Sequence, residues 1–123
     1  MPSNFEDLKI WQNSHKLMLS VYQIISQFPK KDFYALISQL RRSSLSVPAN
    51  IAEAHGRYHY LDKIKFLLNA RGSIEETRSH LRAAIDLELL NQKDFERLNL
   101  EYIGLLRGLN SFIASLKRKN QLK

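Results

Sequence analysis

His55 and His59 are the pair of side chains whose type and spacing come closest to a metal site. On a helix, residues four apart lie on one face, so both imidazoles could reach a single metal ion. Gly56 lies between them at an expected helix end, no third ligand has suitable spacing, and the zinc-protease pattern requires a glutamate after the first histidine. The sequence therefore favours surface or loop histidines and predicts no metal site. His15 lies on an apolar stripe and is expected to be a hydrogen-bonded core histidine.

The sequence also lacks the residue patterns of the common catalytic classes. Di-metal enzymes built on helical bundles need Glu-x-x-His on two helices, and this motif does not occur in the chain. The absence of cysteine excludes disulfides, thiolate nucleophiles and thiolate metal ligands. Ser43, Ser44, Ser46 and Ser73 have no recognisable base partner that would make one of them a nucleophile, and we expect them to pack between helices. We therefore predict a protein that is not an enzyme and that carries no cofactor.

Positive charge is the more informative feature, because the net charge of +7 is unevenly distributed. Residues 28–82 carry ten Lys or Arg against five Asp or Glu, and residues 117–123 carry four Lys or Arg and no acid. Such clustering is typical of a surface that binds a polyanion, and a solvated, solubilising surface is the alternative. The candidate nucleic-acid-binding residues are Lys30, Lys31, Arg41, Arg42, Arg57, Lys63, Lys65, Arg82, Lys117, Arg118 and Lys119. Tyr58 and Tyr60, beside Arg57, could stack on unpaired bases or cover the end of a bundle.

A row of charges lies beside an apolar stripe of the third helical segment, not opposite to it. The row consists of Arg71, Glu75, Arg78 and Arg82. One hypothesis is structural: the arginines pair bidentately with Glu75, Glu76 or Glu53 in a contact between helices or subunits. The other hypothesis is a strip that contacts phosphates. We favour the structural hypothesis for Arg71 and Arg78 and leave both open for Arg82.

Four segments repeat apolar residues at alternating spacings of three and four, which is the pattern of helices that bury one face. They predict helices at about 5–28, 33–56, 60–90 and 92–118. The predicted core positions are Leu8, Trp11, His15, Met18, Tyr22 and Ile25, then Phe33, Ile37, Leu40, Ser44, Val47, Ile51 and Ala54, then Leu61, Ile64, Leu67, Leu68, Ile74, Leu81, Ala84 and Ile85, and finally Phe95, Leu98, Tyr102, Leu105, Leu109, Phe112 and Leu116. Short connections force sequential helices to lie antiparallel. The prediction is an all-α, up-down-up-down four-helix bundle that forms a single domain over residues 1–123.

Asparagine, glycine and proline mark the expected helix boundaries. Asn4 and Asn91 are plausible N-caps, each with an aspartate three residues on, and Gly56 is an expected C-terminal stop. Pro48 lies inside the second helix and removes a backbone donor, so we expect a kink or two abutting helices near it. Gly72 lies within the third helix at a cost of about 1 kcal/mol relative to alanine. With Ala70, Ser73 and Thr77 it forms a small-residue stretch that should let a neighbouring helix approach closely, and the expected partner is the group of small residues of the second helix, Ala49, Ala52 and Ala54.

No signal peptide is visible over residues 1–9, and the apolar runs are only a few residues long. A membrane-spanning helix needs roughly 20 apolar residues, so none is predicted. With no cysteine in the chain, the composition suits a reducing environment. The expected location is the cytoplasm.

Several stretches of the chain resemble one bacterial protein family. They are Phe5-Glu6-Asp7-Leu8 with Trp11, Phe28-Pro29, Gln39-Leu40-Arg41-Arg42-Ser43, Val47-Pro48-Ala49-Asn50-Ile51-Ala52-Glu53, Gly56-Arg57, Phe66-Leu67, Ala70-Arg71-Gly72-Ser73 and Glu75-Glu76-Thr77. In this order they are similar to the four-helix bundle proteins encoded in intervening sequences of 23S ribosomal RNA genes. Ala54 departs from the pattern, because the family commonly has glycine after the glutamate.

The resemblance implies a four-helix bundle that assembles into a ring-like homopentamer and has no established enzymatic activity. It also implies kinship with accessory proteins of diversity-generating retroelements, which have basic surfaces and act with a reverse transcriptase and nucleic acid. Such a reverse transcriptase is the protein partner that the resemblance suggests. Two hypotheses follow: an oligomeric protein that binds nucleic acid, RNA above all, through phosphates, or a scaffold for another protein whose charges serve assembly and solubility.

Overall fold

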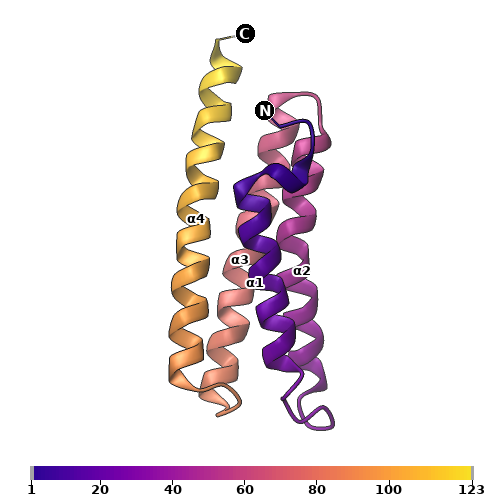
Figure 1. Ribbon diagram of the computed structural model, residues 1–123, viewed down its shortest axis with the longest axis vertical. Coiled ribbons are helices and arrows are strands. Elements are labelled where there is room, and N and C mark those ends of the chain that lie inside the picture. The colour runs from indigo at the N-terminus through magenta and orange to yellow at the C-terminus, as the bar shows by residue number, and fades with distance from the viewer. Residues whose placement is uncertain (1, 123) are drawn as a thin grey trace.

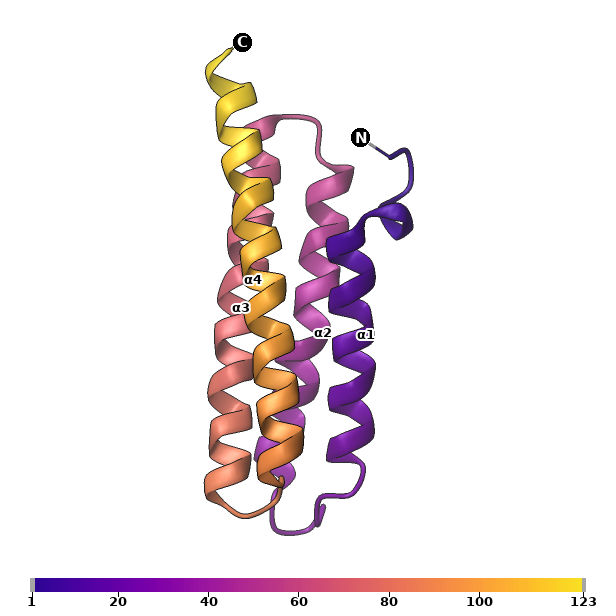
Figure 2. The same ribbon diagram turned by 60° about the vertical axis from the view of Figure 1, so that its left-hand side comes forward.

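The computed structural model describes residues 2–122 and consists of a four-helix bundle preceded by one short helical turn. The elements are the 3-10 helix η1 (Phe5–Asp7), α1 (Lys9–Ile25), α2 (Tyr34–Gly56), α3 (Tyr60–Asp86) and α4 (Gln92–Gln121). Consecutive helices run in opposite directions, and the last turns of α4 project beyond the other helices (Figures 1 and 2). The predicted all-α, up-down four-helix bundle is therefore confirmed. None of the helices within residues 2–122 is long and apolar enough to cross a membrane.

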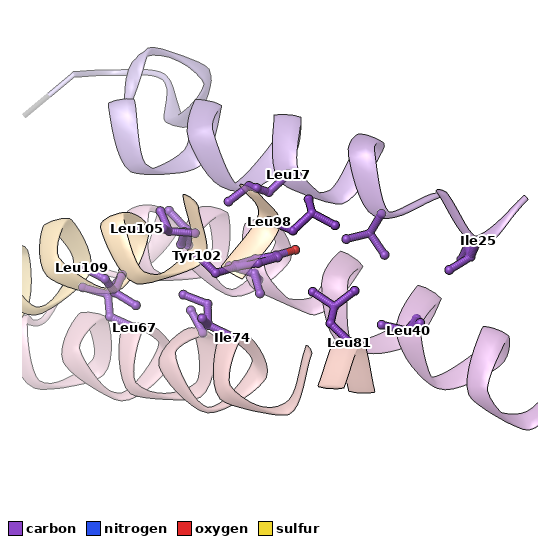
Figure 3. Close-up of a cluster of buried hydrophobic side chains, with 14 of the residues drawn as sticks. Leu17, Ile25, Leu40, Leu67, Ile74, Leu81, Leu98, Tyr102, Leu105 and Leu109 are labelled. Atoms are coloured by element: carbon purple, nitrogen blue, oxygen red, sulfur yellow. The ribbon is translucent and has the colours of Figure 1, made fainter. Parts of the chain in front are cut away.

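The core runs along the axis of the bundle and takes side chains from all four helices (Figure 3). The apolar faces predicted for the second and fourth helices are confirmed, except that Phe33 and Phe112 are half-buried. Side chains that are less than 2% exposed include Leu40, Ile51, Leu98, Tyr102 and Leu116. Burial of these apolar surfaces is the main force that holds helices of this length together.

The faces predicted for the first and third helices are partly wrong. In α1 the core takes Leu17 and Val21, while Trp11, His15 and Tyr22 are only half-buried. The ring of His15 stacks on the ring of Trp11, with 4.7 Å between their centroids. His15 is therefore a half-buried residue at the edge of the bundle, and the prediction of a core histidine is wrong. In α3 the exposed positions include Leu61 and Leu68, which the spacing predicts for the core. Both helices carry more apolar residues than one core face needs, so their spacing alone could not identify the buried set.

Asparagine caps mark two helix starts, but one is not the start that the sequence predicts. Asn91 Oδ1 accepts the backbone N–H of Asp94 at 2.7 Å and caps α4, as expected. Asn4 Oδ1 accepts the N–H of Glu6 at 3.0 Å and caps η1, so the first long helix begins at Lys9 and not near Phe5. The first and third helices also end earlier than predicted, at Ile25 and Asp86. The fourth helix continues past residue 118 to Gln121.

Pro48 lies within α2, which runs without interruption from Tyr34 to Gly56. The alternative of two abutting helices is therefore wrong, and Gly56 ends the helix as predicted. The kink at the proline stays a prediction. Near it, the Asn50 side chain donates from Nδ2 to the Ser46 carbonyl oxygen at 2.8 Å.

Hydroxyl groups join α2 to α3 inside the bundle. Thr77 Oγ1 donates to Ser43 Oγ at 2.9 Å, and the hydroxyls of Ser46 and Ser73 lie 2.9 Å apart. Because Ser43 and Thr77 are fully buried, these small polar groups satisfy one another where the helices pack. The predicted close approach of α2 along the small-residue stretch is found at Ser73 and Thr77, but not at Gly72, where an added Cβ would meet no neighbour within 4 Å. The contacts on α2 are Ser46 and Ser43, whereas Ala49, one of the predicted partners, is exposed.

The free space around Gly72 leads to the first prediction. Gly72→Ala should raise the free energy of unfolding by about 1 kcal/mol, because alanine loses less backbone freedom in a helix interior. Urea denaturation followed by circular dichroism measures the change. Gly56→Ala, at the last residue of α2, is the comparison and should gain less. A loss of stability in Gly72→Ala would show that this face packs against a second molecule.

The hydroxyl of Tyr102 leads to the second prediction, because it is buried with no hydrogen-bond partner within residues 2–122. Removing an unpaired buried hydroxyl relieves its desolvation, so Tyr102→Phe should keep or raise the free energy of unfolding, by about 1 kcal/mol. Burial, and then the nearby Glu101 carboxylate, raise the pKa of Tyr102 above its ordinary value.

The pKa shift of Tyr102 gives this prediction a pH dependence. Above about pH 10 the unfolded tyrosine loses its proton while the folded one keeps it, so the wild type should lose stability that Tyr102→Phe retains. Denaturation at pH 7 and pH 11 measures both effects. A clear drop in stability of Tyr102→Phe at pH 7 would contradict the assignment of an unpaired hydroxyl.

Candidate nucleic-acid interface

The arginine row on α3 lies along the seam with α4, where each arginine meets a side chain of that helix. Arg71 Nη1 donates to Asn110 Oδ1 at 3.1 Å, and Arg78 Nε donates to Asn99 Oδ1 at 2.9 Å. The guanidinium of Arg82 lies 4.6 Å from the centre of the Phe95 ring. The structural hypothesis therefore matches the contacts of Arg71 and Arg78. Their partners on α4 are the side-chain amides of Asn110 and Asn99, and no pattern in the sequence predicted these two contacts.

Of the glutamates proposed as partners of this row, Glu75 pairs with one of its arginines, whereas Glu53 and Glu76 pair with arginines outside it. Glu75 Oε1 accepts from Arg78 Nη1 at 2.8 Å, within the same helix. Glu53 pairs with Arg57 at 3.6 Å, one turn further along α2.

Glu76 forms an ion pair with Arg42 between α2 and α3, and Arg42 Nε also donates to Gln39 Oε1 at 2.9 Å. The ring of His80 lies 3.4 Å from Glu76, and burial, followed by the charge of Arg42, lowers the pKa of His80. Arg41 and Arg42 are both exposed, but Arg42 is occupied by a helix-to-helix contact.

Lys63 caps the end of α2. Its ammonium donates to the carbonyl oxygens of Ala54 at 3.3 Å and His55 at 3.0 Å, which are among the carbonyls left free at a helix C-terminus. Burial lowers the pKa of Lys63. Lys63, one of the candidate nucleic-acid-binding residues, is therefore half-buried and already bound to α2.

A group of cationic and aromatic side chains lies in the connection between α2 and α3 and in the first turns of α3. We name it the turn patch, and it consists of Arg57, Tyr58, His59, Lys65 and Phe66. The Arg57 guanidinium lies 4.6 Å from the centre of the Phe66 ring, and the Lys65 ammonium lies 5.9 Å from it. Tyr58 is 87% exposed, and the ring of His59 meets it edge-on at 5.0 Å. Aromatic faces attract cations, so Phe66 holds Arg57 beside the turn.

Lys117, Arg118 and Lys119, the C-terminal cations, lie in the last turns of α4 at the same end of the bundle as the turn patch (Figures 1 and 2). All three side chains are exposed, and within residues 2–122 none of them makes an ion pair or a hydrogen bond through its side chain. A cavity of about 10 Å³ lies at this end, where the four helices meet. Its lining includes one residue from each helix: Ile10, His55, Lys63 and Phe112.

The structure separates the other candidate cations from this end. Lys30 and Lys31 lie in the connection between α1 and α2, at the opposite end of the bundle, and both are exposed. Arg41 is exposed along α2. The candidate residues brought to one end are Arg57, Lys63, Lys65, Lys117, Arg118 and Lys119.

The histidine pair does not share a helix. His55 lies in the last turns of α2 and lines the small cavity, whereas His59 precedes α3 and is exposed. Among residues 2–122, no group of three or more histidine, aspartate or glutamate side chains could hold a metal ion.

A shallow apolar groove, the α1–α2 groove, runs along the outside of the bundle. Its lining residues are Phe5, Trp11, His15, Met18, Leu45, Pro48, Ala49 and Ala52. On the α2 side Leu45 is 48% exposed and Ala49 is exposed, and on the α1 side Trp11 is half-buried, so apolar surface faces outwards here. The groove explains why the 3-4 spacing of Trp11 and His15 did not mark a core face. An exposed apolar patch of this kind is typical of a protein contact surface.

Two comparisons with known proteins agree with this fold. Residues 6–111 match the family model described as 23S rRNA-intervening sequence protein. A solved structure from Bacteroides thetaiotaomicron, of a protein of unknown function in the S23 ribosomal protein family, is 25% identical, covers 85% of this chain and 97% of that chain, and has a TM-score of 0.77. No curated protein matches the chain. The family model spans η1, α1, α2, α3 and most of α4, and the chain belongs to the 23S rRNA-intervening sequence protein family.

Proposed function

We propose that this chain is a non-enzymatic, oligomeric protein that binds RNA through phosphate contacts at the end of the bundle that carries the turn patch and the C-terminal cations. The observation that carries the proposal is the group of unpaired positive charges there. Within residues 2–122, Lys117, Arg118 and Lys119 are free, and no acidic residue occurs in α4 after Glu101. Neutralising phosphates releases condensed counterions, which is the main source of affinity in binding that does not depend on sequence.

The contacts of the other cations make this end a more suitable site than the sides of the bundle. Arg42, Arg71, Arg78 and Arg82 each contact a neighbouring helix, so a phosphate would compete with these contacts. Arg57 pairs with Glu53, but both side chains are about half exposed, and such a surface pair contributes little. Arg57 therefore remains able to bind a phosphate.

RNA is the first polymer to test, because the family description ties these proteins to sequences that interrupt 23S rRNA. Kinship with accessory proteins of retroelements, and a reverse transcriptase as a partner, stay predictions from resemblance. A cytoplasmic location also stays a prediction.

The α1–α2 groove supports the proposed oligomer and is the observation that favours the scaffold hypothesis. The exposed Leu45 and Ala49 and the half-buried Trp11 line this groove together, and a second copy or another protein could bury them. The family resemblance implies a homopentamer, which we propose as the assembly. In a scaffold that does not bind RNA, the same groove would hold a different protein.

The third prediction tests the phosphate contacts. The triple variant Lys117→Gln, Arg118→Gln, Lys119→Gln should weaken binding to a labelled single-stranded RNA about tenfold or more at low salt. It should also flatten the dependence of log affinity on log salt by about 0.7 for each phosphate that the variant no longer neutralises. Fluorescence anisotropy at several salt concentrations measures both. Glutamine keeps the helix propensity of α4.

The matched control for this variant removes the same charge elsewhere. Lys30→Gln, Lys31→Gln, Arg41→Gln takes three exposed cations from the opposite end and the side of the bundle. Equal losses of affinity in both triple variants would show that net charge, and not the proposed end, governs binding. If the wild type binds neither RNA nor DNA at low salt, the RNA-binding proposal fails and the scaffold hypothesis takes its place.

The fourth prediction tests the α1–α2 groove. Leu45→Glu with Ala49→Glu places two carboxylates on its α2 side and should lower the oligomer mass in sedimentation or light scattering. Circular dichroism should be unchanged, because both positions are exposed. Leu100→Glu, at a leucine of α4 that is 67% exposed, is the control and should leave the mass unchanged. An unchanged mass in the double variant would exclude the groove as the assembly surface.

A further inference from the structure

Tyr58 is a large aromatic side chain that the fold leaves almost fully in water. It lies in the connection between α2 and α3, and it is 87% exposed, although tyrosine commonly packs most of its ring against other residues. The edge-on contact with His59 at 5.0 Å and 88° is the ring contact that the structure gives it. Most of the Tyr58 ring is therefore available to a flat partner.

Two cations belong to the turn patch with Tyr58, one in the same connection and one in the first turns of α3. Arg57 precedes Tyr58, with its guanidinium held over Phe66 at 4.6 Å, and Lys65 lies further along the chain near the same ring. A ring beside fixed cations is the combination found in proteins that bind single strands, where bases stack on aromatic side chains while the cations follow the phosphates. Neither group alone would favour a polymer, but the two together match a nucleotide, which has a base and a phosphate.

We infer that Tyr58 stacks on an unpaired base and that the RNA bound at this end is single-stranded. This inference rests on the proposed function and adds that the bound RNA is a single strand and not a duplex. In a duplex the bases are already stacked on one another, and the deep, narrow major groove of RNA closes them to side chains. A tyrosine in a turn meets a base face only where the strand is unpaired.

The exposed tyrosine at the other end of the bundle provides a comparison within the same chain. Tyr34 is 74% exposed at the first position of α2. Within residues 2–122 the structure records no ring contact for Tyr34, whereas the ring of Tyr58 meets His59. The residue directly before Tyr34 is Phe33, whereas the residue directly before Tyr58 is Arg57. Tyr34 therefore has the exposure of Tyr58 without the adjacent arginine on which the inference depends.

The test compares two polymers and three variants by fluorescence anisotropy at one low salt concentration. The probes are a labelled oligouridine single strand and a labelled RNA duplex of the same length. Tyr58→Ala should weaken binding of the single strand about tenfold and change duplex binding less than about twofold, because loss of one stacked base costs roughly that much. Tyr58→Phe should bind like the wild type, since stacking needs the ring and not the hydroxyl. Tyr34→Ala should bind both probes like the wild type.

The outcomes separate this inference from the proposed function. If the wild type binds the single strand, but Tyr58→Ala binds it equally well or weakens for both polymers equally, the stacking inference is wrong and the phosphate contacts stand. If the wild type binds neither probe, the proposed function itself fails. A loss of affinity in Tyr34→Ala as large as that in Tyr58→Ala would also overturn the inference.

A second readout reports stacking directly. In Tyr58→Trp the new indole should be quenched by the added oligouridine, while the wild type, with only the half-buried Trp11, should show little change. An unquenched Tyr58→Trp that still binds the strand would show that no base lies on this ring.

Discussion

α2 and α3 are joined by residues 57–59 alone, and the packing of these two helices governs the rest of the structure. So short a connection forces them to lie antiparallel, with the hydroxyls of Ser43 and Thr77 buried and bonded between them. Arg42 and Glu76 pair across the same seam, and Lys63 returns from α3 to the last carbonyls of α2. These contacts hold the turn at a defined place on the end of the bundle. Its side chains are thereby presented to solvent on a rigid support.

The cations of this chain fall into two groups according to their neighbours. Arginines on the helix sides, such as Arg71 and Arg78, use their planar groups to bridge α3 to α4, where an amide accepts a hydrogen bond in fixed geometry. Lysines and arginines at the end of α4 have no such neighbour within residues 2–122. A count of charges in the sequence treats the two groups alike. Only the contacts show which cations are already held against a neighbouring helix and which remain free for a polyanion.

The sequence predicted the helices, their order and the faces of α2 and α4, because these faces carry one apolar stripe each. It failed for Leu61 and Leu68, and for the side of α1 that bears Trp11, because these helices have a second apolar stripe and spacing cannot say which is buried. The partners Asn99 and Asn110 also escaped prediction. Pairing between helices depends on their relative rotation and shift, and no local pattern in one helix contains either.

The helix ends themselves do not cancel the positive field at the proposed site. The C-termini of α2 and α4 lie at this end together with the N-termini of α1 and α3 (Figure 1). Each terminus carries the equivalent of roughly half a charge, negative at C-termini and positive at N-termini, so the four contributions nearly sum to zero. Lys63 offsets the carbonyls of α2 directly. Glu53 offsets Arg57, and Glu6, Asp7 and Asp62 are the other acidic side chains at this end. Lys65, Lys117, Arg118 and Lys119 outnumber these three, so positive charge remains in excess, which is the condition that attraction of a phosphate chain requires.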